Sequence, residues 1–166
     1  TSGSEVEPMT PSSILFLLAI GMGAGLSPWA PGTMGCVLFM LFWWPLAACS
    51  RRLYAMVLGG VVVVGIPLCG FATDVIGVED APAIVWDELG GLLLALSVVP
   101  RHPLWGLLGL ASFRFFDVLK VWPVGWVDQN LAGGLGIMLD DLVAGLYALL
   151  VLMVARCVWR LRSPSP

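Results

Sequence analysis

Charge is the scarcest feature of this sequence. Asp, Glu, Lys and Arg together make up 11% of its 166 residues, against about 25% in soluble domains. Hydrophobic residues make up 59%, which predicts an integral membrane protein rather than a soluble one with an unusually apolar core. Barrel-type alternation is absent and open sheet edges are not viable in lipid, so we predict an all-α, polytopic membrane helical bundle.

Several signatures of chemistry are absent as well. His102 is the only histidine and stands on a Pro-flanked turn, which excludes a phosphohistidine mechanism and a Ser-His-Asp triad. There is no Walker A loop and no D-x-D-x-[TV] signature of an aspartyl nucleophile. The four cysteines form no C-x-x-C, which argues against a zinc or redox site. With a net charge of −3 and no Lys/Arg run, the sequence indicates no nucleic-acid partner.

We expect one domain. A polar segment, 1–12, precedes a single membrane-embedded domain, 13–162, and a short tail, 163–166, follows it. Thr1–Ser4 is typical of a cloning remnant. No internal repeat is visible, and nothing in the sequence specifies an oligomeric state.

Apolar runs predict about 4–6 helices, some of them short or re-entrant. A span needs about 20 residues, so Ile14–Gly25 is expected to enter the membrane without crossing it. Leu53–Phe71 is the clearest spanning segment, with Pro67 kinking its end before a polar loop, 73–82. The remaining expected helices are Met34–Ala48, which Thr33 would cap, Ile84–Val99, Leu104–Phe116 and Ile137–Trp159.

The few acidic residues are concentrated in one part of the chain. Nine of the eleven lie between Asp74 and Asp141. Charges kept beside apolar sequence are costly and usually mark function. If each apolar segment crosses the membrane, residues 27–33, 74–88 and 114–141 meet at one face, and the turns at Arg51 and Arg101 and the tail at Arg156 meet at the other.

Two acidic pairs, Asp87-Glu88 and Asp140-Asp141, each lie early in an apolar helix. Neighbours on a helix point about 100° apart, so one member of each pair can face a common centre while the other supports it. Oxygen-rich sites of this kind suit Mg²⁺ or Mn²⁺. Helix capping is the alternative, because the macrodipole favours acids in a first turn, but it accounts for one acid per helix better than for four.

Basic residues accompany the acids. Arg114, Asp117 and Lys120 are spaced i, i+3, i+6, so on a helix Asp117 can bridge its two cationic neighbours. Arg and Lys beside a metal are suited to holding phosphate oxygens. An ion-pair ladder at the membrane interface is the alternative.

Glycines and hydroxyls offer weaker signals. The glycines of 133–136 precede the expected last helix and can expose backbone N–H groups to an anion, although glycine also serves helix packing. Ser27 and Thr33 can donate to a substrate or water, although isolated hydroxyls are more often caps.

Four blocks stand in order between Gly21 and Gly145: GMGAGLSPWAPGTMG, IVWDELGG, FRFFDVLKVWP and DQNLAGGLGIMLDDLVAG. Together they resemble the phosphatidylglycerophosphatase A family of bacterial membrane phosphatases. The resemblance implies hydrolysis of the terminal phosphomonoester of phosphatidylglycerol phosphate, with Mg²⁺ as cofactor, to give phosphatidylglycerol and inorganic phosphate. Val121, Ala132 and Cys36 depart from the pattern, but none of them replaces an acid or a cation.

The resemblance also implies roles for individual residues. The metal ligands would be Asp87, Glu88, Asp140 and Asp141, with help from Asp117 or Asp128. Asp117 joins these four as a catalytic residue. Grooves between helices would hold the acyl chains among the membrane lipids. The residues expected to bind the substrate phosphate are Arg114, Lys120, Ser27, Thr33 and Gly134.

Other functions and mechanisms remain open at this point. A small membrane ion or proton transporter would also keep carboxylates in the membrane, although Arg114 and Lys120 beside them favour a phosphate ligand. A phosphotransferase acting on a CDP-lipid would show a D-G-x-x-A-R signature, which is missing. The sequence does not distinguish attack by water from a covalent aspartyl-phosphate.

Two arguments disagree on orientation. The family's substrate is made at the cytoplasmic side, so the resemblance implies a multi-pass protein of the bacterial inner membrane with its site facing the cytoplasm. Lys and Arg usually concentrate on the cytoplasmic side, however. The acidic face holds only Arg114 and Lys120, whereas the opposite face holds Arg51, Arg52, Arg101, Arg156, Arg160 and Arg162.

Overall fold

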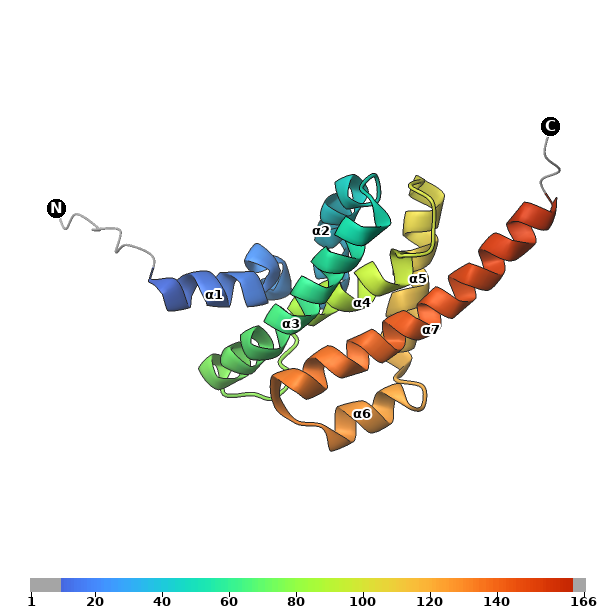
Figure 1. Cartoon of the computed structure of the whole chain (residues 1–166). Helices are drawn as coiled ribbons and strands as arrows, with labels where there is room; N and C mark the ends of the chain where they lie inside the picture. The colour runs from blue at the N-terminus through green and yellow to red at the C-terminus, as the bar shows by residue number, and fades with distance from the viewer. Residues whose placement is uncertain (1–9, 163–166) are drawn as a thin grey trace.

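A computed structural model describes residues 10–162, and all its regular elements are helical (Figure 1). Within this range there is no strand, which confirms the all-helical prediction. The expected cloning remnant and the tail, 163–166, lie outside the described residues. The elements are α1 (Pro11–Ala19), the 3-10 helix η1 (Gly21–Leu26), α2 (Pro31–Leu46), α3 (Arg51–Ile76), α4 (Trp86–Leu96), α5 (Pro103–Leu119), α6 (Val124–Asn130) and α7 (Gly133–Arg162).

Helix α4 is the centre of the bundle. It packs against α2, α3, α5 and most extensively against α7, and all of its residues except Trp86 and Leu94 are buried. Figure 1 shows it between the long helices α3 and α7 and the steeply inclined α5. At 1.5 Å per residue its 11 residues extend about 16 Å, roughly half of a bilayer's hydrocarbon thickness. A central helix of this length cannot cross a membrane.

Two of the described helices, α3 and α7, are long and apolar enough to cross a membrane, and α2 is a shorter apolar helix. Helix α3 is unlike the core helix of a soluble protein, because only 22% of its most apolar window is buried. The apolar segment Ile14–Gly25 is not one continuous helix, since α1 ends at Ala19 and η1 follows with left-handed backbone angles at Met22 and Gly23. The predicted total of about 4–6 membrane helices is not confirmed.

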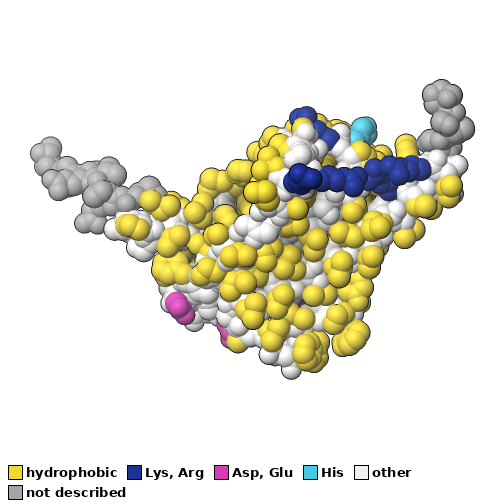
Figure 2. All heavy atoms as spheres, in the orientation of Figure 1, with side chains coloured by type: hydrophobic (Ala, Val, Ile, Leu, Met, Phe, Trp, Pro, Cys, Tyr) yellow, Lys and Arg dark blue, Asp and Glu magenta, His cyan; other side chains and the backbone are white. Residues whose placement is uncertain are grey.

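The surface is organised in a way that is compatible with membrane association. Figure 2 shows a broad apolar surface between Lys and Arg side chains at the top and acidic side chains at the bottom. The exposed apolar side chains come from several helices, with exposures of 70% at Leu41, 72% at Met56 and 63% at Leu107. The two polar ends therefore carry opposite charge.

Two glycines set the distance between α4 and α7. A Cβ atom on Gly91 would lie 2.6 Å from the backbone oxygen of Asp141 and 2.4 Å from the ring of Phe113. A Cβ atom on Gly145 would lie 2.4 Å from the backbone oxygen of Gly91. Small residues at a helix crossing allow the two backbones to approach closely. The crossing brings the beginning of α4 beside the first half of α7.

Several helix boundaries differ from the prediction. Helix α2 begins at Pro31, whose fixed φ suits a first helical position, so Thr33 lies inside the first turn and the prediction that it caps the helix is wrong. Helix α3 continues beyond Pro67 to Ile76, where Gly77 in the left-handed conformation ends it. The loop between α3 and α4 therefore runs from residue 77 to residue 85, not from 73 to 82.

Two further differences lie near the C-terminal helix. Helix α6 was not predicted, because its only core-facing residues are Val124 and Val127, too few to give a helical pattern. Helix α7 begins at Gly133, so the glycines of 133–136 form its first turn instead of preceding it.

Candidate active site

A cavity of about 280 Å³ lies at the acidic end of the molecule. It is bounded by the start of α2, the loop before α4, the first turn of α4, the end of α5 and the first half of α7. The cavity brings together both predicted acidic pairs and the predicted cations. The charged residues that line it are Asp80, Asp87, Glu88, Arg114, Asp117, Lys120, Asp140 and Asp141.

Helix α4 contributes Asp87 and Glu88, both buried in its first turn. Oε1 of Glu88 accepts a hydrogen bond of 2.9 Å from Nη1 of Arg114. Helix α2 passes so close that a Cβ atom on Gly32 would lie 1.8 Å from the same oxygen. Burial raises the pKa of Glu88 to about 8, and the charge of Arg114 opposes this rise. Glu88 thus ties α2 and α5 to the centre of the bundle.

Helix α7 contributes Asp140 and Asp141, residues that are 5% and 3% exposed. Oδ1 of Asp140 accepts from the backbone N–H of Asp141 at 3.0 Å, and its Oδ2 lies 3.4 Å from Nζ of Lys120. Asp140 is therefore held by a cation, as Glu88 is on α4.

The other member of each pair has an oxygen without a partner. Oδ1 of Asp87 and Oδ2 of Asp141 are fully buried and have no hydrogen-bond partner within the described part of the chain. A buried polar atom left unpaired is costly and needs an explanation, such as an ion. In each acidic pair, one member contacts a cation and the other has a buried oxygen without a partner.

Arg114 and Lys120 are held differently. Arg114 forms ion pairs with Glu88 and Asp117, the second spaced i, i+3 as predicted. The prediction that Asp117 also bridges to Lys120 is wrong. Helix α5 ends at Leu119 and Lys120 adopts a left-handed conformation with φ 43°, which takes it off the helical register.

Lys120 instead contacts three carboxylates, Asp80 at 3.5 Å, Asp140 at 3.4 Å and Asp128. Partial burial lowers the pKa of Lys120, but the hydrogen bond from Lys120 to Asp128 and the charges of Asp140 and Asp80 raise it above its ordinary value. Its ammonium group therefore stays charged.

Asp80 is the site residue that sequence reasoning missed. The ligating oxygens of Asp80, Asp128 and Asp140 lie within 4.8 Å of one another, so this group could also hold a cation. The sequence contained only a weak indication of this role. Asp80 stands in a polar loop expected at the same face as the acidic pairs, but loop acids are common without function.

Three predicted phosphate ligands do not line the cavity. Oγ of Ser27 donates to the backbone oxygen of Trp29 at 3.0 Å within its own turn. Thr33 lies in the first turn of α2. A Cβ atom on Gly134 would lie 1.9 Å from the backbone oxygen of Ile66, so this glycine allows α7 to pack on α3.

The donor set fits a hard divalent cation. All the candidate ligands are carboxylate oxygens, which Mg²⁺ prefers. Asp87 and Asp141, each with a buried oxygen that lacks a partner, come from facing helices and line one cavity. These two residues are the strongest candidates to hold a metal, with Glu88 and Asp140 beside them.

Comparison with known proteins places the chain in a family. The sequence model for phosphatidylglycerophosphatase A matches residues 17–156. A phosphatidylglycerophosphatase A of Escherichia coli is 42% identical over 130 residues, which cover 78% of this chain and 76% of that protein. A phosphatidylglycerophosphatase A of Haemophilus influenzae is 36% identical over 156 residues, covering 89% and 94%.

A Bacteroides thetaiotaomicron protein provisionally named a phosphatidylinositol-3-phosphatase is 33% identical over 156 residues, covering 89% of this chain and 97% of that protein. No solved structure matches the chain. These matches make the chain a phosphomonoester hydrolase by class. The chain belongs to the phosphatidylglycerophosphatase A family, which confirms the resemblance seen in its sequence.

If the unpaired oxygens bind a divalent cation, millimolar Mg²⁺ should raise the melting temperature of the purified protein by a few degrees, because a ligand stabilises the state that binds it. We expect Asp87→Asn and Asp141→Asn each to lose most of this Mg²⁺-dependent increment, measured by a thermal-shift assay in detergent. Asp74→Asn, on an exposed position of α3, is the matched control and should keep it. If Mg²⁺ raised the melting temperature of both site variants as much as that of the wild type, the metal would bind elsewhere.

Proposed function

We propose that the protein hydrolyses the terminal phosphomonoester of phosphatidylglycerol phosphate, with Mg²⁺ as cofactor, and releases phosphatidylglycerol and inorganic phosphate. The observation that carries this proposal is one cavity in which two acidic pairs meet Arg114 and Lys120 at a polar end of an apolar bundle. The names of the Escherichia coli and Haemophilus influenzae relatives support the choice of substrate.

The charge balance of the cavity supports a requirement for metal. Six acidic and two basic side chains line it, so a phosphate dianion would enter a site that is already negative. Asp87, Glu88, Asp140 and Asp141 would hold Mg²⁺, which when bound supplies positive charge to the phosphate oxygens and lowers the pKa of a bound water.

The chain's own cations then orient the phosphate. Arg114 forms ion pairs with Glu88 and Asp117. Lys120 forms ion pairs with Asp80, Asp128 and Asp140. Both cations are therefore held in position before the substrate binds. They bind the non-bridging oxygens and stabilise charge as the phosphoryl group is transferred. Water attacks phosphorus as a cavity carboxylate accepts its proton. The bond from phosphorus to the glycerol oxygen breaks, and the carboxylate passes the proton to that oxygen, which leaves as the alcohol.

A second cavity supports a lipid substrate. It measures about 520 Å³, lies between α1, η1, α2, α3 and α4, and is lined almost entirely by apolar groups. Trp86 and Leu89, which flank the acidic pair of α4, belong to its lining. An acyl chain held there would lie on the same helix that presents Asp87 and Glu88 to the phosphate.

An ion or proton transporter is the less favoured function. Arg114 and Lys120 would repel a cation moving through the cavity, and the comparisons do not point to transport. The two cations suit an anionic group that is bound and then converted.

The activity test is Mg²⁺-dependent phosphate release from phosphatidylglycerol phosphate in detergent micelles. We expect Asp87→Asn and Asp140→Asn to lower kcat/KM by about 100-fold or more, because each loses charge beside the reacting phosphate, and EDTA to abolish turnover of the wild type. Asp74→Asn should match the wild type.

Two results would count against the proposal. Full activity in both site variants would remove the cavity from the reaction. Faster release from phosphatidylinositol 3-phosphate than from phosphatidylglycerol phosphate would shift the substrate toward that of the Bacteroides thetaiotaomicron relative's name.

We also propose that the acidic cavity faces the cytoplasm from the bacterial inner membrane, where the phosphorylated lipid is made. The arginine-rich end then faces the periplasm, against the usual charge distribution. Two native thiols can report on this. Cys49, in the turn before α3, and Cys157, in the last part of α7, are exposed, whereas Cys36 and Cys69 are buried.

A membrane-impermeant maleimide should therefore label the wild type in intact spheroplasts, and Cys49→Ser should reduce the labelling. Glu79→Cys, introduced at the acidic end in a Cys49→Ser/Cys157→Ser background, should react only in inside-out vesicles. Labelling of position 79 in intact spheroplasts, with no labelling of Cys49 there, would show that the acidic cavity faces the periplasm.

A further inference from the structure

A further cavity lies at the arginine-rich end, away from the acidic site. It has a volume of about 940 Å³ and is bordered by the turn before α3, the first half of α3, the end of α4 and the last part of α7. It shares no lining residue with the acidic cavity. Neither the proposed hydrolysis nor the family match assigns it a role.

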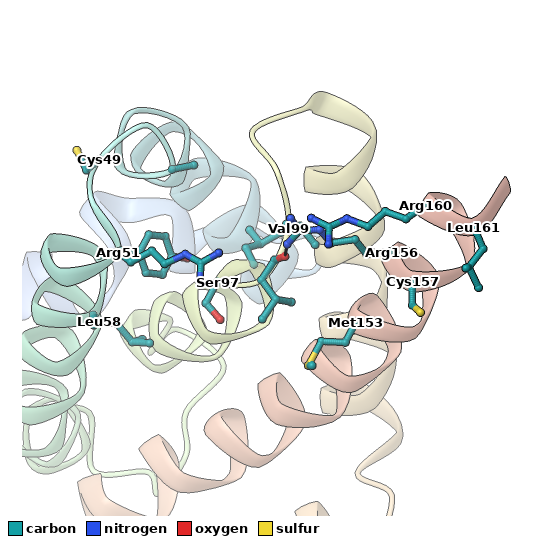
Figure 3. A pocket seen from close by; sticks show the side chains of 15 residues that line it. Cys49, Arg51, Leu58, Ser97, Val99, Met153, Arg156, Cys157, Arg160 and Leu161 are labelled. Atoms are coloured by element: carbon teal, nitrogen blue, oxygen red, sulfur yellow. Dashed lines mark hydrogen bonds between the residues drawn. The ribbon is translucent and has the colours of Figure 1, made fainter. Parts of the chain in front are cut away.

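Three arginines converge on this cavity. Figure 3 shows Arg51 from α3 pointing toward Arg156 and Arg160 of α7, across the space beside Ser97 and Val99. Arg156 is anchored because its guanidinium donates a hydrogen bond to the backbone oxygen of Val98. The charges of Arg160 and Arg51 both act on Arg156, so the three guanidinium groups repel one another.

No carboxylate balances these arginines within residues 10–162. The lining contains no acidic side chain. Every ion pair in the described part of the chain belongs to Arg114 or Lys120, at the opposite end. Cations gathered in a cavity without a counter-charge make a site that is complementary to an anion.

Most of the rest of the lining is apolar. Leu58, Leu96 and Met153 form part of the wall, and Leu161 at its edge is 81% exposed. The cavity therefore offers cations at the polar end of the molecule and hydrocarbon contacts along α3 and α7, the two helices of membrane-spanning length.

We propose that this cavity binds one anionic glycerophospholipid, with its headgroup phosphate on Arg51, Arg156 and Arg160 and its acyl chains against the apolar lining. Basic pockets between membrane helices bind anionic headgroups in this way. A free phosphate would use the arginines but leave the apolar wall without a ligand, and a zwitterionic lipid would bring no net charge to offset three cations. The site does not depend on the phosphatase activity.

The test compares two lipids with identical acyl chains. Phosphatidylserine and phosphatidylcholine are added to the delipidated protein in detergent, and the melting temperature is followed as a function of lipid. Phosphatidylserine is used because it is neither the proposed substrate nor the proposed product. We expect it to raise the melting temperature at a concentration at least tenfold below that at which phosphatidylcholine gives the same shift.

The variants separate the site from general surface charge. Arg51→Gln/Arg160→Gln keeps the Arg156 hydrogen bond and should lose this preference. Arg52→Gln/Arg101→Gln removes the same charge from positions outside the lining and should retain it.

The proposal is overturned if phosphatidylserine and phosphatidylcholine act alike on the wild type. It is also overturned if both double variants lose the preference equally, or if soluble glycerol 3-phosphate reproduces the shift. Unchanged Mg²⁺-dependent phosphate release in Arg51→Gln/Arg160→Gln would show that the variant is folded and that the two sites are separate.

Discussion

The close approach of α4 and α7 is the constraint on which the rest of the site depends. Gly91 and Gly145 let the two backbones touch where any side chain would collide. Because one acidic pair begins α4 and the other lies in α7, this crossing places four carboxylates around one cavity. Helix α4 is too short to span a bilayer, so its charged first turn starts inside the bundle and is covered by its neighbours.

Electrostatics then divides the molecule into two unlike ends. At the acidic end, Glu88 and Asp140 are neutralised by Arg114 and Lys120, while Asp87 and Asp141 keep buried oxygens without partners. At the other end, arginines gather without carboxylates. The acidic end thus has an excess of negative charge, which suits a divalent cation with a phosphate. The other end has an excess of positive charge, which suits an anionic lipid. A lipid phosphate would also offset the positive charge that the proposed orientation leaves at the periplasmic end.

Much of this arrangement could be predicted from the sequence, because the acids and cations stand in short motifs whose helical spacing limits where they point. The meeting of both acidic pairs at one cavity was foreseen on that basis, whereas the contact of Glu88 and Asp140 with the two cations was not. The positions of Lys120 and Asp80 were not, since both depend on residues with positive φ at helix ends and loops, where no periodic pattern exists. Gly134 could be a packing or an anion-binding residue by sequence, and only its contact with Ile66 distinguishes the two.

The central claim is that the α4–α7 crossing builds the active site, and Gly91→Ala tests it most directly. The measurement is the Mg²⁺-dependent rate of phosphate release from phosphatidylglycerol phosphate per molecule that retains wild-type helical circular dichroism. The new methyl group would collide with α7 beside Asp141, so we predict a rate at least tenfold below that of Gly59→Ala, whose methyl group meets nothing within 4 Å. A folded Gly91→Ala protein with the full rate of Gly59→Ala would contradict this account.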